Sequence, residues 1–290
     1  ENLLLSVSWV RFPDKTCMGH EEVSLGKIEH IAIYPVKSAG MLKLHEATIT
    51  PEGIVGDRKY MIVRATPNTD GVFEFITQRD KRNKEDRSEA PQSLAILSQI
   101  KPEMRNNVLN LTWKGGDAIA VPEKMDSGQE ITVRIWDDVV QAVDQGDTLA
   151  EWLSDHLNLK VRLVKAAGNF KRKARQNYMQ NDNTMRFQDG YPVHWFFQES
   201  VDELAQRAEE NISWENFRPN IVVSGSPAQT EHVVHSGIIG GIPFIDPKPC
   251  DRCEVTNVDQ DTGALVAGRA LRPLVKYKKW PDNEGRQKSI

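Results

Sequence analysis

In its C-terminal quarter the chain reads Pro249-Cys250-Asp251-Arg252-Cys253, then Glu254-Val255-Thr256-Asn257-Val258, then Asp259-Gln260-Asp261-Thr262-Gly263. The first stretch holds two of the three cysteines of the chain, with an arginine between them. The second is rich in β-branched residues and predicts a strand, and the third predicts a turn. A thiolate is a soft metal ligand, and a neighbouring guanidinium both stabilises it and grips phosphate through two parallel hydrogen bonds. The segment therefore indicates a cysteine that binds a metal together with an anionic group.

Three other interpretations of this cysteine pair stay open. A dithiol redox motif usually lies between a strand and a helix, and the strand-like residues after Cys253 disfavour it. A zinc site needs four ligands, which His232 and His235 would complete, but three-residue spacing in a strand places them on opposite faces. The third interpretation is two buried structural cysteines, because free cysteine is among the most buried residue types.

Length and composition describe an ordinary soluble globular protein. The 290 residues are 39% hydrophobic and 27% charged, enough for one large or two modest domains. A net charge of -4 predicts no general attraction to nucleic acid. The odd cysteine count predicts no disulfide framework, so we expect a reducing intracellular compartment, cytoplasmic or mitochondrial. No stretch approaches the about 18 apolar residues of a membrane span. The first residue is Glu1 rather than a methionine, so an upstream targeting segment or anchor stays open.

From residue 27 onwards, short strand patterns alternate with turns, whereas residues 1–26 show no sustained period and are interpreted as a leader or extension. Predicted strands cover 27–34, 47–50, 59–63, 72–77, 108–113, 131–136, 161–164, 221–223, 233–234, 244–245 and 255–258. Helices are predicted over 147–157, with Asp147 as N-cap, and over 200–208, with a Ser200–Glu203 capping box. These elements predict an α+β fold that is mainly β and barrel-like, with a few helices, and not an alternating dinucleotide-binding fold.

Two charged segments are predicted to be solvated loops, residues 80–87 and 171–175. For the second, Lys171-Arg172-Lys173-Ala174-Arg175, attraction of an anionic cofactor or an acidic redox partner is the alternative.

Three more segments place cationic donors where loops leave the predicted sheet, the usual position of binding groups. Tyr34–Gly40 presents Lys37 and Ser38 after a strand, Gly56–Arg58 presents an arginine before one, and Asn216–Asn220 presents another between a helix and a strand. Together with Arg252 they form the set of donors that a phosphorylated, metal-bearing cofactor needs.

Five motifs in this order resemble those of the MOSC-domain proteins that carry an N-terminal MOSC β-barrel domain, the family of the mitochondrial amidoxime-reducing components and their bacterial relatives. The motifs are Pro-Val-Lys-Ser at 35–38, Gly-Asp-Arg at 56–58, Asp-Gly-Tyr-Pro at 189–192, Asn-Phe-Arg-Pro-Asn at 216–220 and Cys-Asp-Arg-Cys at 250–253. The resemblance runs from about residue 27 to residue 280. It implies a MOSC-type β-barrel, with a smaller N-terminal domain at 27–146 and the MOSC domain at 147–290.

The resemblance implies a molybdenum cofactor, Mo-molybdopterin, with Cys253 rather than Cys250 as the metal ligand. It places Asp189 and Asn220 close to the metal, so that Cys253, Asp189 and Asn220 are the expected catalytic residues, with Asp189 as a proton relay. The expected cofactor-binding residues are Lys37, Ser38, Arg58, Asp189, Gly190, Arg218, Asn220 and Arg252.

The implied activity is reduction of N-hydroxylated substrates: amidoximes, hydroxylamines and N-hydroxylated bases. Electrons would come from a donor protein, cytochrome b5-like or a flavin or iron–sulfur reductase, and the chain is expected to be a monomer. Pyridoxal phosphate is not expected. Two alternatives remain: a cofactor-binding or sulfur-carrier module similar to the C-terminal domain of molybdenum-cofactor sulfurases, and a zinc-stabilised structural protein.

The chain also departs from the family pattern. The family continues with a barrel-closing strand where this sequence ends at Ile290, so the C-terminal end is expected to be truncated and the barrel edge open. Residues 195–199 are more aromatic than the family norm, which predicts a different pocket mouth.

Overall fold

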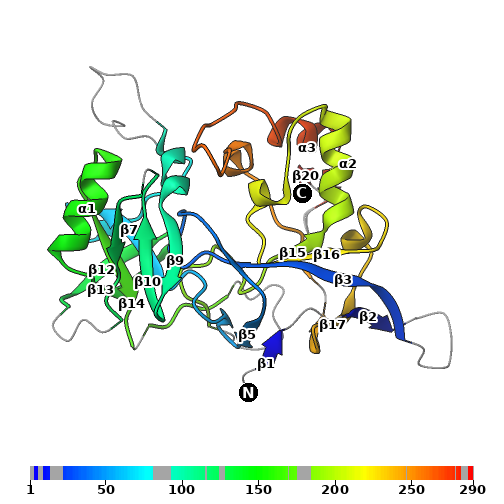
Figure 1. Ribbon diagram of the computed structural model, residues 1–290, viewed down its shortest axis with the longest axis horizontal. Coiled ribbons are helices and arrows are strands. Elements are labelled where there is room, and N and C mark those ends of the chain that lie inside the picture. Colours follow the sequence, from blue (N-terminus) through cyan, green and yellow to red (C-terminus); the bar gives the residue numbers. More distant parts are fainter. Residues whose placement is uncertain are drawn as a thin grey trace.

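The structure is a computed structural model, and the predicted class, α+β and mainly β, is confirmed. It describes residues 3–5, 9–13, 22–80, 93–114, 116–123, 128–168, 170–174, 184–245, 247–277, 279–281 and 287–289. Figure 1 shows two groups of strands, one beside helix α1 and the other, which includes the long strand β3, beside helices α2 and α3.

The first group contains a five-stranded and a three-stranded sheet. The five-stranded sheet has the order β7 (Tyr60–Arg64), β14 (Val161–Ala166), β13 (Asp138–Asp144), β12 (Glu130–Ile135) and β8 (Phe73–Glu74). The three-stranded sheet has the order β11 (Ala118–Ala120), β10 (Val108–Thr112) and β9 (Lys101–Arg105), and the 3-10 helix η1 (Leu94–Gln99) precedes it.

Helix α1 (Asp147–Leu157) packs on this group through one apolar stripe. Leu149, Leu153 and Leu157 recur every four residues, so they lie on one face of the helix, and all three are buried. They share a core with Leu163 of β14 and Leu97 of η1. The domain boundary at 146/147 stays a prediction; β14, which follows it in sequence, pairs with β13 and β7, which precede it.

The second group is a seven-stranded sheet. Its order is β15 (Trp195–Phe197), β16 (Ile221–Ser224), β3 (Glu22–Ile33), β2 (Trp9–Pro13), β17 (Ser236–Ile239) and β18 (Ile242–Ile245), with β4 (Leu42–Leu44) paired to β3. Smaller pairings join β1 (Leu3–Leu5), β5 (Ala47–Thr50) and β6 (Gly53–Ile54), and join β19 (Lys279–Pro281) to β20 (Gln287–Ser289).

Both faces of the central strands of this sheet are buried. In β3, Ile31 and Ile33 face one apolar cluster while Ala32 faces the other, and in β16 Val223 and Val222 divide in the same way. Helix α2 (Gln198–Ala208) and helix α3 (Leu271–Tyr277) cover the second face. Burial on both sides explains why residues 31–33 and 221–223 are continuous apolar runs rather than alternating ones.

The predicted N-terminal extension is partly built into the sheets. β1 and β2 both fall within residues 1–26, and β2 pairs with β3 and with β17. The predicted charged loop at 80–87 lies, beyond Asp80, outside the described residues.

Three predicted strands are wrong or too long. Residues 254–257 form the 3-10 helix η5, because the Thr256 N–H and hydroxyl both bond to the Cys253 carbonyl, at 3.1 and 2.9 Å. Val233 and Val234 lie between the 3-10 helix η4 (Thr230–His232) and β17. The predicted strand 72–77 shortens to β8, which pairs with β12 over only Phe73 and Glu74.

Both predicted helices form, but their predicted caps are wrong. Gly146 occupies the N-cap of α1, and Asp147 lies in its first turn, where it pairs with Arg162 Nη2 at 2.8 Å. α2 begins at Gln198, so Ser200 lies inside the helix and its hydroxyl bonds to Glu231 Oε2 at 2.8 Å.

Candidate active site

The candidate site begins where the chain crosses from β3 to the five-stranded sheet. Lys37 N–H donates to the Tyr60 carbonyl at 2.8 Å, and Tyr60 N–H donates to the Pro35 carbonyl at 2.9 Å. Backbone bonds to β7 therefore fix the position of Lys37, and its ammonium is carried into the protein, where the side chain is only 5% exposed.

The Lys37 ammonium meets Asp189 at 2.5 Å and donates to the Phe187 carbonyl at 2.9 Å. Trp136 Nε1 donates to the same Asp189 oxygen at 2.9 Å. Burial by the surrounding chain favours a higher pKa for Asp189, but the Lys37 charge and these hydrogen bonds outweigh it and hold the pKa well below its ordinary value. Since its side chain is still 75% exposed, Asp189 is an ionised carboxylate that solvent reaches.

A second group of site residues is built around the buried Tyr34 ring. The guanidinium carbons of Arg58 and Arg218 each lie 4.2 Å from the ring centroid, within cation–π distance. Arg58 also forms a two-oxygen ion pair with the fully buried Asp57, at 2.6 Å to each oxygen. Both arginines have positive φ angles, 45° and 54°, an uncommon conformation that aims them inward.

A side-chain hydrogen bond from Asn220 to β3 and another to the His194 N–H link β3 to the segment before β15. The Asn220 side chain donates to the Ala32 carbonyl at 3.1 Å and accepts the His194 N–H at 3.1 Å, so it fixes β3 to the loop that enters β15. Asn220 is 2% exposed and its amide is occupied by backbone partners. It therefore holds the scaffold of the site, and its expected catalytic role stays a prediction.

The Cys250–Cys253 segment reaches the same region through Arg252. Arg252 Nη2 lies 3.1 Å from His194 Nε2, and its guanidinium carbon lies 5.2 Å from the Phe217 ring centroid. Burial, together with Arg252 and Arg58, lowers the pKa of His194 well below its ordinary value. The imidazole is thus neutral at pH 7, and its Nε2 accepts from Arg252, which has only donors to offer.

The two cysteines differ in exposure. Both thiols are free; Cys250 is exposed, whereas Cys253 is partly buried at the start of η5. Among the described residues, no group of three or more His, Cys, Asp or Glu is placed to hold a metal ion by itself. His232, His235, Cys250 and Cys253 therefore do not form the four-ligand site that the zinc alternative requires.

Arg218 and Ser38 are held by two buried glutamines. Arg218 Nη1 donates to Gln260 Oε1 at 3.0 Å, and Gln78 Nε2 donates to the Ser38 carbonyl at 2.7 Å. Burial lowers the pKa of Arg218 to about 10, so its guanidinium still carries a charge at neutral pH.

Arg58, Arg218 and Arg252 differ in whether a carboxylate neutralises their charge. Arg58 is neutralised by Asp57, but the hydrogen-bond partners of Arg218 and Arg252 are a neutral amide and a neutral imidazole. Within the described part of the chain, no carboxylate forms an ion pair with either of these two. A partly buried charge without a counter-ion is unfavourable, and both arginines are partly buried, so the site is suited to an anionic ligand.

Known proteins match almost the whole chain. The family profile of the MOSC N-terminal beta barrel domain matches residues 25–160, and that of the MOSC domain matches residues 182–281. Mitochondrial amidoxime reducing component 2 of Rattus norvegicus is 30% identical over 285 residues, which cover 94% of this chain and 78% of that protein.

The chain belongs to the MOSC family.

Other relatives fall into two groups. Mitochondrial amidoxime reducing component 2 of Bos taurus is 28% identical, with 88% of this chain and 73% of that protein covered. Molybdenum cofactor sulfurase of Bombyx mori is 24% identical, with 81% of this chain but only 28% of that protein covered. The MOSC domain is a molybdenum-cofactor-binding family, so the anionic ligand suited to this site has a chemical precedent. No helix among the described residues is both long and apolar enough to cross a membrane.

The expected MOSC site residues are largely brought together by the fold. Lys37 contacts Asp189, Arg58 and Arg218 share the Tyr34 ring, and Gln78 holds Ser38. The remaining members adjoin these in sequence: Gly190 follows Asp189 and is partly buried, and Cys253 follows Arg252.

Several residues of this MOSC site were missed by the sequence analysis, namely Tyr34, Gln78, Trp136, Arg172, His194 and Gln260. The interpretation of 171–175 as a solvated loop is wrong for Arg172, whose side chain is 3% exposed. Its guanidinium bonds to Asp138 and to the carbonyls of residues 186, 188 and 189, so it fixes the loop that carries Asp189. The sequence does not distinguish Arg172 from the other basic residues of 171–175, so its burial could not be predicted.

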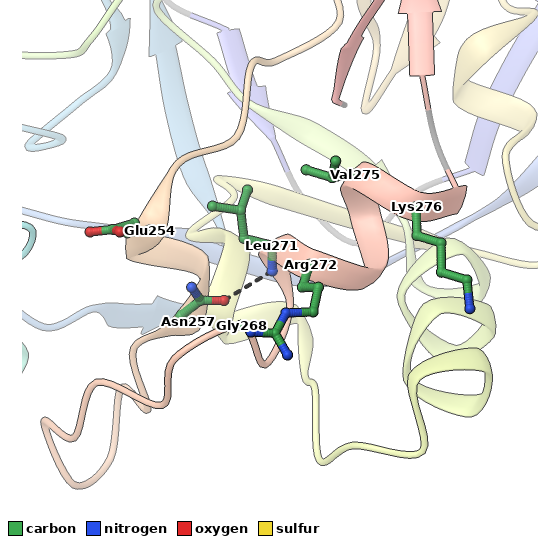
Figure 2. Close-up of a pocket in the computed structure, with 7 residues that line it drawn as sticks. All are labelled: Glu254, Asn257, Gly268, Leu271, Arg272, Val275 and Lys276. Carbon is green, nitrogen blue, oxygen red and sulfur yellow. Dashed lines mark hydrogen bonds between the residues drawn. The ribbon is translucent and has the colours of Figure 1, made fainter.

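A hollow of about 480 Å³ lies behind the Cys253 segment of the MOSC domain, between η5 and α3. Its lining consists of Glu254, Asn257, Gly268, Leu271, Arg272, Val275 and Lys276. Figure 2 shows the Asn257 side-chain oxygen bonded to the N–H of Leu271, which ties η5 to the start of α3. None of the expected cofactor-binding residues lines this hollow.

Proposed function

We propose that this chain binds a molybdenum cofactor and reduces N-hydroxylated compounds such as amidoximes, hydroxylamines and N-hydroxylated bases. The observation that supports it most is that Arg218 and Arg252 have no carboxylate partner among the described residues, and that Arg252 directly precedes the free cysteine Cys253. Arginine forks suit phosphate, and a thiolate suits a soft-ligated metal. Relatives named amidoxime reducing components support the reaction class.

In this proposal each group has a separate role. Arg218 and Arg252 bind the phosphate and ring of the cofactor, and Arg58, neutralised by Asp57, supports Arg218 by donating to its carbonyl at 3.4 Å. Lys37 and Ser38 complete the cradle from the side of β7, and Cys253 is the metal ligand. When bound, the cofactor supplies the redox centre that the protein side chains lack.

Asp189 is the proposed proton relay. Reduction of an N-hydroxyl group releases its oxygen as water, which requires protons at the reacting atom. The Asp189 carboxylate is exposed on one side and bonded to Lys37 and Trp136 on the other, so it can pass protons inward from solvent. Its lowered pKa keeps it ionised at neutral pH, so in this role it would hold a transferred proton only briefly.

The partners belong to the same proposal. Electrons would come from a donor protein, cytochrome b5-like or a flavin or iron–sulfur reductase, to a monomeric chain in a reducing compartment. The relatives named mitochondrial amidoxime reducing components favour a mitochondrial over a cytoplasmic location.

Metal and pterin analysis tests the proposal. Purified wild type is expected to hold molybdenum and a fluorescent pterin, and Cys253→Ser to lose the molybdenum with an unchanged circular dichroism spectrum. Cys250→Ser is the matched control, because that thiol is exposed and only three positions away in the sequence. Equal loss in both variants would contradict the assignment of the ligand, and zinc without pterin in the wild type would overturn the proposal.

A sulfur-carrier or cofactor-carrier module is the second candidate, favoured by the match to the sulfurase of Bombyx mori. Both candidates bind the cofactor, so metal content does not separate them. Reduction of benzamidoxime by the loaded protein with a chemical electron donor does: sustained turnover supports the reductase, and retained cofactor without turnover supports the carrier.

A further inference from the structure

Gln78 and Gln260 form a reciprocal amide pair inside the protein, although 182 residues separate them. Gln78 Nε2 donates to Gln260 Oε1 at 3.2 Å, and Gln260 Nε2 donates back to Gln78 Oε1 at 3.0 Å. The residues are 0% and 5% exposed. Two buried amides in this head-to-tail arrangement satisfy each other and fix each other's orientation.

Each member of the pair also holds one expected cofactor residue. The Gln78 amide donates to the carbonyl of Ser38, which has a left-handed backbone conformation with φ of 68°. The Gln260 oxygen accepts from the Arg218 guanidinium. A continuous chain of side-chain hydrogen bonds thus runs from Ser38 through both glutamines to Arg218.

The Gln260 end of the pair is anchored independently. Its backbone carbonyl accepts from Lys101 Nζ at 2.6 Å and from Gln99 Nε2 at 3.4 Å. Both donors belong to the first group of strands, at η1 and β9, whereas Gln260 lies seven residues after Cys253 in the second. The pair therefore sits at the junction of the two groups.

We infer that Gln78 and Gln260 are positioning residues that hold Ser38 and Arg218 at a fixed separation for the anionic part of the cofactor. The inference rests on the proposed function. A neutral pair serves this purpose because it orients the Arg218 guanidinium without cancelling its charge. A carboxylate at position 260 would neutralise that charge. It would also place a carboxylate oxygen against Gln78 Oε1, where Gln260 Nε2 now donates a hydrogen bond.

The test compares cofactor retention in Gln78→Met, Gln260→Met, the double variant and Gln260→Glu. Gln145→Met is the matched control, because Gln145 is 3% exposed and donates to the Val143 carbonyl, among residues of β13 rather than of the site. We expect about ten-fold weaker retention of molybdenum and pterin on dialysis in each single methionine variant. The double variant is expected to lose no more than the worse single variant, since either change breaks the same chain of bonds.

Gln260→Glu separates positioning from general stability. It is nearly isosteric and gives Arg218 a counter-ion, so we expect it still to fold, as judged by circular dichroism, and yet to retain the cofactor poorly. Wild-type retention in Gln260→Glu, additive losses in the double variant, or an equal loss in Gln145→Met would overturn the inference.

Hydrogen exchange keeps the inference testable without the cofactor. In cofactor-free protein, peptides that contain Ser38 and Arg218 are expected to exchange faster in both single methionine variants than in wild type or Gln145→Met. Absence of molybdenum and pterin from the wild type would overturn the proposed function alone. Unchanged exchange in the two peptides would overturn the amide pair as a positioning device whatever the wild type contains.

Discussion

Arginines in this protein differ by what neutralises them rather than by where they lie in sequence. Arg58 and Arg269 have carboxylate partners, Asp57 and Asp259, whereas Arg218 and Arg252 have neutral ones. A guanidinium that already has a counter-ion gains little from a second anion, and one without gains a charge-assisted hydrogen bond. Removal of an arginine with a neutral partner should therefore lower the affinity for an anionic ligand more than removal of one with a carboxylate partner.

The first prediction compares two arginines on this basis. Arg252→Met should lower cofactor retention by about ten-fold, because it removes an uncompensated donor, whereas Arg269→Met should leave retention close to wild type. Molybdenum content per folded chain is the measurement. Equal losses in the two variants would show that the charge balance does not select the site.

The second prediction concerns pH and Asp189. Its pKa is lower in the folded chain than in the unfolded one, so its stabilising effect is present above the ordinary pKa of about 4 and is lost as pH falls through the folded pKa. The difference in unfolding temperature between wild type and Asp189→Asn should be constant near neutral pH and shrink in acid. In assays of the loaded enzyme, Asp189→Asn should lower turnover; full turnover across pH would remove the relay role.

At the scale of elements, the site depends on how the loop that carries Asp189 is held in place. The loop that carries Asp189 has no strand of its own, and Arg172 takes the place of a strand partner by binding three of its carbonyls and Asp138. The Arg172 side chain thus fixes residues 186–189 through their carbonyls, whereas β7 is fixed by backbone hydrogen bonds to a neighbouring strand.

The third prediction tests that role. Arg172→Met should lower the free energy of unfolding by about 3 kcal/mol, because it leaves buried carbonyls without donors and Asp138 without its partner. Arg105→Met, which removes only an exposed pair with Glu103, should change stability little. Chemical denaturation of both variants is the measurement, and similar values for the two would contradict the assigned role of Arg172.

The periodicity of single elements was predicted well where burial is one-sided. The 147–157 stripe and the 47–50 strand were found with their predicted bounds. The strand predicted at 255–258 is wrong, because the β-branched side chains there favour a strand while local bonds to the Cys253 carbonyl turn the backbone. The predicted capping box is wrong for a similar reason, since the Ser200 hydroxyl bonds instead to Glu231 and to the N–H of Gln229 on another segment.

At the scale of the whole molecule, the site belongs to neither group of strands alone. Lys37 and Arg58 follow and precede strands of different groups, Trp136 comes from the β12–β13 turn, and Arg218 and Arg252 come from the second group. A ligand that binds them all would link both groups and stabilise only the folded state.

The fourth prediction follows from that arrangement. Cofactor-loaded protein should unfold in a single transition at a temperature several degrees above that of cofactor-free protein, because binding to the native state alone raises its stability by mass action. Calorimetry of loaded wild type, cofactor-free wild type and Cys253→Ser provides the comparison. Two separate transitions with only one shifted by loading would place the ligand within one group.

The sequence by itself determined the fold class, the strand and helix stripes and the set of donors, because these depend on residue types and on spacings within a few turns of chain. The tertiary structure alone decided which arginine found a carboxylate, that Arg172 is buried, and that His194, Trp136 and the two glutamines border the site. Those outcomes depend on which distant segments the sheets bring within hydrogen-bond distance. Charge balance at a site is set by such contacts, and no local pattern records them.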